Sequence, residues 1–149
     1  MAFRAAFYKK RRPGLAMIYS VAVQLWTRSP YSHCELIFSD GTSASSSFID
    51  RGVRFKNIDY DSDHWDFIDL PDDLEQDARN WFVRHEHLPY DILGNITFII
   101  SPVNGSKNKW FCSEACLASL GVENPGRFSP GQAHAILTEV SKTWRRYVK

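Results

Sequence analysis

Short apolar or alternating segments, separated by turn residues, dominate the first half of the chain. Alternation with a period of two residues is typical of strands that bury one face. The pattern predicts strands over residues 3–8, 32–39, 42–49, 53–58 and 65–70. Asp40-Gly41 and Asp50-Arg51-Gly52 supply the turn signals between consecutive segments. We therefore expect a small antiparallel sheet.

Apolar residues recur at helical spacing after Pro71. The spacing of Leu74, Ala78 and Phe82 predicts a helix from Asp73 to about residue 87. Asp72 and Glu75 have the separation of a capping box, with aspartate replacing the usual serine or threonine. This helix would follow the sheet directly.

The second half of the chain supplies the remaining predicted elements. Asp91–Ile100 is apolar and is predicted as a short helix, and residues 102–109 as a loop. A helix is expected from Cys112 to Gly121, and another from Ser129-Pro130 through residue 140, with proline in its first turn. The basic tail over residues 144–149 is predicted as an edge strand. Helices at both ends with strands between them indicate an α+β fold.

The segment Leu15–Trp26 is apolar and follows four basic residues, so two interpretations are open. It fits a buried core helix, and it also resembles the apolar region of a targeting segment. No small-residue cleavage site follows it, and it is too short to span a bilayer. We therefore expect a core helix and no stable membrane span.

Composition narrows the class of protein. A length of 149 residues predicts a single domain over residues 1–149, large enough for a substantial core. The net charge of +1 offers no electrostatic case for a nucleic-acid partner. Three cysteines do not form a disulfide framework. We therefore predict a reducing, cytoplasmic location, with export as the alternative that the apolar segment Leu15–Trp26 leaves open; association with a virus particle is an alternative only by resemblance to a known family.

Cys112 is the candidate nucleophile. The first turn of a helix presents N–H groups without partners and a partial positive charge. That field stabilises a thiolate, which is the reactive form of cysteine. The alternative is a buried structural cysteine, which is how we interpret Cys116 one turn later because alanines surround it.

His33 has the best context among the five histidines. In the predicted strand His33 and Glu35 point to one face, while Cys34 and Leu36 point to the other. Glu35 would orient the imidazole and stabilise its cationic form. The alternative is a half-exposed strand whose polar side chains simply face water. The remaining histidines are predicted to lie on the surface or near helix ends; they are His64, His85, His87 and His134.

A zinc site and a calcium site are the metal-binding alternatives to a nucleophilic cysteine. Cys112 and Cys116, with His33 or His64, offer ligands for zinc, but two residues is the usual number between paired thiolates in structural zinc sites. The aspartates of residues 59–66 lack the glycine and terminal glutamate of a calcium-binding loop. We therefore predict no metal and no cofactor.

The order of these residues resembles a known family. A histidine on a strand comes first and a cysteine at a helix start comes later, which is the reverse of papain. The segments Tyr31–Leu36, Pro89–Gly94, Phe111–Cys116 and Arg127–Gly131 together resemble the circularly permuted papain-fold cysteine hydrolases. The similarity is to the YiiX-like branch of the NlpC group, related to the lecithin:retinol acyltransferase-like enzymes.

The resemblance implies a permuted papain-like fold, in which a small antiparallel sheet packs against helices. It implies Cys112 as nucleophile and His33 as base, with the backbone N–H groups of Cys112 and Ser113 forming part of an oxyanion hole. In this branch the third residue lies on the strand after the histidine. Here that strand is rich in serine and has no carboxylate before Asp50. Glu35 is predicted instead, because it shares the face of His33.

The expected function is a cysteine peptidase or amidase that forms a thiol acyl-enzyme. Its partners would be a peptide or a cell-wall peptide, and small relatives of this kind are frequent in bacteria and their viruses. One alternative is an acyl hydrolase or acyltransferase acting on lipids or thioesters. Another is a binding protein without activity, directed at a host factor.

Overall fold

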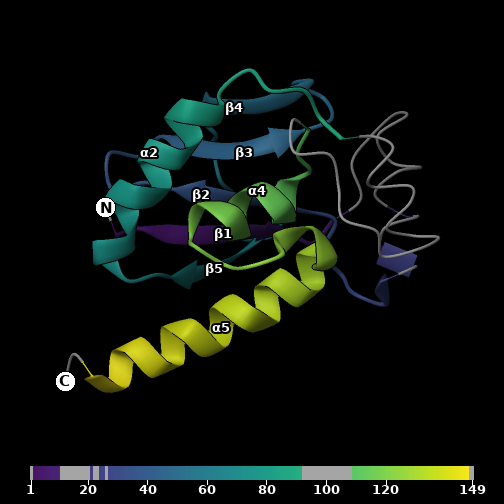
Figure 1. Ribbon diagram of the computed structural model, residues 1–149. Coiled ribbons are helices and arrows are strands. Elements are labelled where there is room, and N and C mark those ends of the chain that lie inside the picture. The colour runs from purple at the N-terminus through teal and green to yellow at the C-terminus, as the bar shows by residue number, and fades with distance from the viewer. Residues whose placement is uncertain (1, 11–20, 22–23, 26, 92–108, 148–149) are drawn as a thin grey trace.

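The fold is built on one antiparallel sheet with helices on one side, as the computed structural model in Figure 1 shows. The structure describes residues 2–10, 21, 24–25, 27–91 and 109–147. The described elements are β1 (Arg4–Tyr8), β2 (His33–Ile37), β3 (Ser43–Ser47), β4 (Gly52–Lys56), β5 (Trp65–Asp69), η1 (Asp72–Leu74), α2 (Glu75–His85), α4 (Cys112–Ser119), η2 (Pro125–Arg127) and α5 (Pro130–Tyr147). An α+β fold with an antiparallel sheet is thereby confirmed.

The five strands lie in the order β4-β3-β2-β1-β5. All four neighbouring pairs are antiparallel. Each observed strand falls within one residue of the predicted range at its start and within three at its end. The β2–β3 turn forms at Asp40-Gly41, where Gly41 has a φ of +86° and its N–H donates to Phe38 O. The site-bearing strand β2 is therefore held on both edges.

The two sheet faces differ in what covers them. One face, here called the helix face, carries Phe7, Cys34, Leu36 and Phe55, which pack with side chains from the helices in the main core. The other, here called the opposite face, carries His33 and Glu35. The alternation follows from the two-residue period of a strand. Figure 1 shows α2 and α4 in front of the helix face and α5 along its β5 side.

The helix α2 lies where the sequence predicts it, but a 3-10 turn precedes it and no side chain caps its start. It buries Ala78 and Phe82, and the 3-10 turn η1 precedes it. The predicted capping box at Asp72 and Glu75 is wrong, because neither start carries a side-chain cap. Glu75 instead accepts hydrogen bonds from the backbone N–H and the hydroxyl of Ser39. This carboxylate therefore ties the helix to the end of β2.

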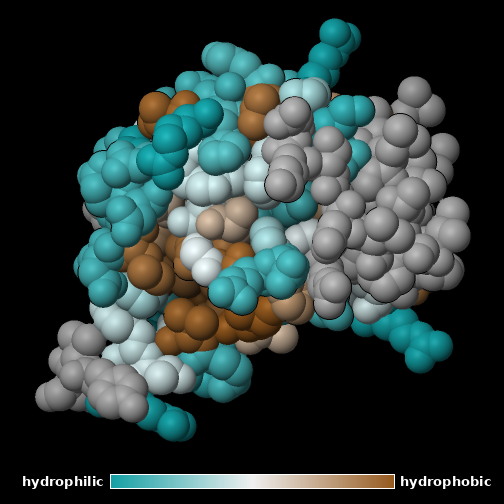
Figure 2. Space-filling view, viewed as in Figure 1, coloured by the Kyte–Doolittle hydropathy of each residue, from teal (hydrophilic) through white to brown (hydrophobic). Residues whose placement is uncertain are grey.

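The helix α4 starts at Cys112, as predicted, and is the most deeply buried helix of the described part. Seven of its eight residues are buried, and it contacts β2 and β3. Gly121, two residues beyond its end, has a φ of +79°. Apolar surface remains exposed between α4 and α5 in Figure 2.

The last helix is longer than expected. α5 runs from Pro130 to Tyr147, so the prediction of an edge strand over the basic tail is wrong for residues 144–147. Arg145, in its last turns, donates a hydrogen bond to Asp69 at the end of β5. That ion pair joins the C-terminal part of α5 to the sheet.

Three predictions fall largely outside the described residues: the helix over 15–27, the short helix over 91–100 and the loop over 102–109. Within the first of these ranges, Leu25 is described and is exposed. The choice between a core helix and a targeting segment stays a prediction. Among the described helices none is long and apolar enough to cross a membrane.

A connection crosses the opposite face between β4 and β5. Its Tyr60 packs with Ile37, Trp65 and Phe67 in a second, smaller apolar cluster. The Tyr60 hydroxyl donates a hydrogen bond of 2.9 Å to Ser43 Oγ. This covering explains why serines and carboxylates on that face are buried although no described helix lies over them.

Candidate active site

Cys112 is the first residue of α4 and is only 3 % exposed. The preceding residue, Phe111, has an extended backbone, so the helix begins sharply at the cysteine. The N–H groups of Cys112 and Ser113 belong to the first turn, where a helix supplies no acceptor. The Ser113 side chain is engaged elsewhere, because its hydroxyl donates to Phe128 O at 2.7 Å. This leaves the backbone as the source of donors at this point.

His33 is the first residue of β2, and its ring is held by a carboxylate. His33 Nε2 lies 2.7 Å from Glu35 Oε1, and both side chains are buried. The Trp65 ring meets the imidazole edge to face, with centroids 6.3 Å apart. The predicted pairing of His33 with Glu35 on one strand face is therefore present in the structure.

Cys112 interacts with the first two residues of β2. A hydrogen bond from Cys34 and the charge of His33 hold the pKa of the Cys112 thiol well below its ordinary value, in spite of burial. Burial alone would lower the pKa of the His33 imidazole, but the charge of Cys112 and the hydrogen bonds to Cys112 and Glu35 raise it. Both directions favour a thiolate–imidazolium pair.

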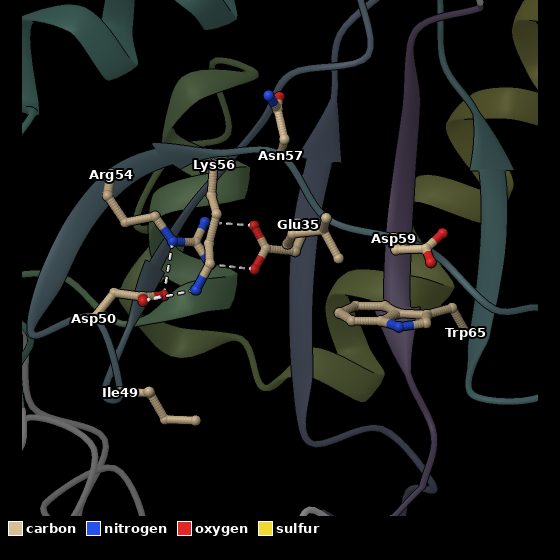
Figure 3. Close-up of a pocket in the computed structure, with 9 residues that line it drawn as sticks. Glu35, Ile49, Asp50, Arg54, Lys56, Asn57, Asp59 and Trp65 are labelled. Carbon is tan, nitrogen blue, oxygen red and sulfur yellow. Dashed lines mark hydrogen bonds and ion pairs between the residues drawn. The ribbon is translucent and has the colours of Figure 1, made fainter.

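The structure also shows a residue that the sequence did not point to. Arg54, on β4, donates from Nη1 to Glu35 Oε2 and from Nη2 to Glu35 Oε1, each at 2.6 Å. Arg54 Nε donates to Asp50 Oδ2 at 2.9 Å, and Lys56 Nζ donates to Asp50 Oδ1 at 2.9 Å. Figure 3 shows the two carboxylates on either side of the guanidinium group.

Burial would raise the pKa of the Glu35 carboxyl, but hydrogen bonds from Arg54 and His33 outweigh it and lower that pKa to about 2. Hydrogen bonds from Lys56 and Arg54 likewise lower the pKa of Asp50 to about 2, against the effect of burial. Both groups are therefore carboxylates at neutral pH. The negative charge of Glu35, which stabilises the cationic form of the His33 imidazole, is therefore present beside the ring.

The register of β3 explains how Arg54 reaches Glu35. Ser45 pairs with Arg54, so it lies on the opposite face between β4 and β2. Its side chain is small and turns back to donate to Cys34 O at 2.7 Å. The arginine can therefore extend over β3. Strand period and pairing could have indicated this contact, but the register is not readable from one strand alone.

A pocket of about 340 Å³ lies beside this ion pair on the opposite face. Its lining residues are Glu35, Ile49, Asp50, Arg54, Lys56, Asn57, Ile58, Asp59 and Trp65. Figure 3 shows the Glu35 carboxylate between the guanidinium of Arg54 and the ring of Trp65. The pocket thus borders the residue that holds His33, rather than the cysteine itself.

The other candidate residues lie elsewhere. Cys116 is buried in the core, as predicted. His64 pairs with Asp61 at 2.6 Å, His85 Nδ1 lies 2.7 Å from Trp81 O, and His134 lies 3.2 Å from the hydroxyl of Tyr31. Within the described ranges no three His, Cys, Asp or Glu side chains form a group suited to a metal ion.

No protein-family model matches this chain, and no curated protein matches it either. The functional proposal therefore rests on the geometry of the described residues.

Proposed function

We propose that this protein is a cysteine hydrolase, of permuted papain-like type, that cleaves an amide bond through a thiol acyl-enzyme. The supporting observations are the position of Cys112 at a helix start, the lowered pKa of its thiol, to which Cys34 and His33 both contribute, and the 2.7 Å hydrogen bond between His33 Nε2 and Glu35 Oε1. A nucleophile, a base and an orienting group in contact are the requirements of this chemistry.

In the first step the Cys112 thiolate attacks the carbonyl carbon of the substrate. The negative charge that develops on the carbonyl oxygen is stabilised by the N–H groups of Cys112 and Ser113. As the tetrahedral intermediate collapses, the His33 imidazolium gives its proton to the leaving amine. The products of this step are a thioester on Cys112, a free amine and a neutral imidazole.

In the second step His33 takes a proton from a water molecule that attacks the thioester. The carboxylic acid leaves, and Cys112 departs as a thiolate beside the restored imidazolium. Glu35 accepts a hydrogen bond from Nε2 throughout, which leaves Nδ1 for the reacting groups. The carboxylate therefore keeps the ring in one orientation and stabilises its charged form.

Peptide amides, including those of cell-wall peptides, are the proposed substrates. Ester and thioester bonds have the same acyl chemistry, so they are the alternative that an activity panel decides. Such a panel contains peptide amides, acyl esters and acyl thioesters at equal concentration. The proposal expects the highest kcat/KM on an amide.

The nucleophile is tested by alkylation with iodoacetamide between pH 4 and pH 10, followed by peptide mapping, because the pKa of the Cys112 thiol is held low. We expect Cys112 to react at pH 6 faster than a free thiol, because a lowered pKa leaves a larger fraction of it as thiolate. Cys112→Ala should abolish hydrolysis, and His33→Gln should remove the fast alkylation.

The matched control is His64→Gln. His64 also pairs with a carboxylate, Asp61, but its side chain is exposed and takes no part in the proposed mechanism. The His64→Gln variant should leave the alkylation of Cys112 and the rate of hydrolysis unchanged. A Cys112 that alkylates no faster than a free thiol, together with hydrolysis that survives Cys112→Ala, would contradict the proposal.

A further inference from the structure

We propose that Arg54 is a positioning residue for this site: its guanidinium fork clamps the Glu35 carboxylate in the orientation that engages His33. The inference rests on the proposed hydrolase function and extends it to a residue on a strand that does not contact the nucleophile. Arg54 itself touches neither Cys112 nor a reacting atom in the proposed mechanism.

The clamp is geometrically specific. Two parallel N–H···O bonds of 2.6 Å join Arg54 to both oxygens of Glu35, and the side chain of Glu35 is only 1 % exposed. Such a bidentate pair fixes the plane of the carboxylate as well as its position. Since Glu35 Oε1 also lies 2.7 Å from His33 Nε2, the plane fixed by Arg54 also fixes the ring.

The clamp also determines the charge of Glu35. A buried carboxyl without a cationic partner tends to bind a proton. The groups that face Glu35 are His33 on β2, Arg54 on β4 and Tyr60 from the crossing connection. Of these only Arg54 is cationic at every working pH. Without it, His33 alone would oppose the effect of burial on the pKa of the Glu35 carboxyl, and Glu35 would stabilise the imidazolium less.

Arg54 is itself held. Asp50 accepts a hydrogen bond from Nε, and Lys56 donates to the second oxygen of the same carboxylate. The Arg54 side chain is 13 % exposed and lines the pocket of about 340 Å³. A small solute can therefore reach the place that the guanidinium would vacate in a truncated variant.

That access permits a rescue experiment. Arg54→Ala is expected to slow Cys112 alkylation at pH 6 by about tenfold, because a less stabilised imidazolium leaves a smaller fraction of the thiol ionised. Guanidinium chloride at about 50 mM, well below denaturing concentration, should restore much of the lost rate. Urea at the same concentration has the same shape without the charge and should restore none.

Two further variants separate orientation from folding. Arg54→Lys keeps a cation but loses the fork, and is expected to fall between the wild type and Arg54→Ala. Lys142→Met removes a cation whose ion pair with Glu139 is exposed and outside this site, and should leave the alkylation profile unchanged. Circular dichroism of every variant reports whether the fold is retained.

The outcomes distinguish this inference from the proposed function. Wild-type alkylation no faster than that of a free thiol, together with hydrolysis that survives Cys112→Ala, would overturn the function. Fast wild-type alkylation with a profile unchanged in Arg54→Ala would overturn only the role of Arg54. A loss that guanidinium and urea restore equally, or that neither restores in a folded variant, would show a structural role and also overturn it.

Discussion

Opposite charges alternate along a line of side chains from α4 to β4. The pKa directions favour a Cys112 thiolate and a His33 imidazolium, and the Glu35 carboxylate, the Arg54 guanidinium and the Asp50 carboxylate follow them. Lys56 follows at the exposed end. Each buried charge in this line is compensated by the charges on either side. Removing one member therefore affects its neighbours as well as the site.

Glu35→Gln tests this dependence. It leaves the Arg54 guanidinium with one carboxylate instead of two, in a largely buried position. We expect a loss of about 3 kcal/mol in the free energy of unfolding, as is typical when one partner of a buried ion pair is removed. Urea denaturation at pH 7 measures it.

The double variant Glu35→Leu with Arg54→Met is the companion measurement. Replacing both charges by apolar side chains should recover much of the stability while activity stays absent. A loss of stability in the double variant equal to the sum of the losses in Glu35→Leu and Arg54→Met would show that the pair is not coupled.

The sequence predicted the contact of His33 with Glu35 because it depends only on the two-residue period of one strand. The position of Cys112 was predictable because a helix start is a local signal. Arg54 was not, since its contact with Glu35 requires the pairing of three strands and a small residue at Ser45. A single sequence does not determine that register.

At the scale of elements, the start of α4 contains an unusual carboxyl. Glu114 is 6 % exposed and accepts a hydrogen bond of 3.4 Å from Phe111 N. Burial, with the charge of Asp91, raises its pKa from 4.5 to about 7. The folded protein therefore favours the neutral acid at this position.

The sign of the pH dependence follows from linkage. Below pH 4.5 the Glu114 carboxyl binds a proton in both states, and between pH 4.5 and about 7 only the folded state keeps it. Stability should thus decrease over this interval, by at most about 3 kcal/mol. Glu114→Gln keeps an oxygen acceptor and should remove this decrease. Urea titrations at pH 5 and pH 8 compare the two proteins.

The start of β4 depends on a glycine, Gly52. A Cβ on Gly52 would lie 2.2 Å from the backbone oxygen of Leu88, so the backbone would have to move. Gly52→Ala is expected to cost about 3 kcal/mol of unfolding free energy. Gly41→Ala is the control, since nothing lies within 4 Å and only its φ of +86° opposes a side chain; about 1 kcal/mol is expected there. Equal losses would contradict the steric explanation.

Two predictions, the edge strand over the basic tail and the capping box at Glu75, are wrong for physical reasons. The tail over residues 144–147 contains aromatic residues that favour strands, yet it continues a helix that is already formed. Adding a turn to an existing helix avoids the cost of nucleation, and the Arg145–Asp69 pair holds it to the sheet. Glu75 likewise had the spacing of a cap, but a tertiary contact with Ser39 takes its carboxylate.

For the whole molecule, the buried carboxylates predict acid sensitivity. The pKa of Glu35 is lowered from 4.5 to about 2. Its contribution to stability is fully present above about pH 4.5 and is lost as the pH falls toward 2, amounting to about 3 kcal/mol. Together with Glu114, this should place the maximum of stability near pH 4.5.

Urea denaturation from pH 2 to pH 6 measures the acid limb. Arg54→Met should flatten it, because an unclamped Glu35 gains no stability from ionising. Lys142→Met breaks only the exposed pair with Glu139 and should leave the limb unchanged. A wild-type profile without loss of stability down to pH 2 would contradict the clamp as the source of acid sensitivity.

The place of β1 in the sheet has a consequence for the order of assembly during synthesis. It precedes every other described strand in the chain, yet it lies between β2 and β5 and needs both as partners. Its apolar residues Ala5, Ala6 and Phe7 are buried only when the later strands have emerged from the ribosome. Until then it presents two unpaired edges, which is a hazard for aggregation. Chaperone binding to the nascent chain is therefore expected to be strongest before β5 is complete.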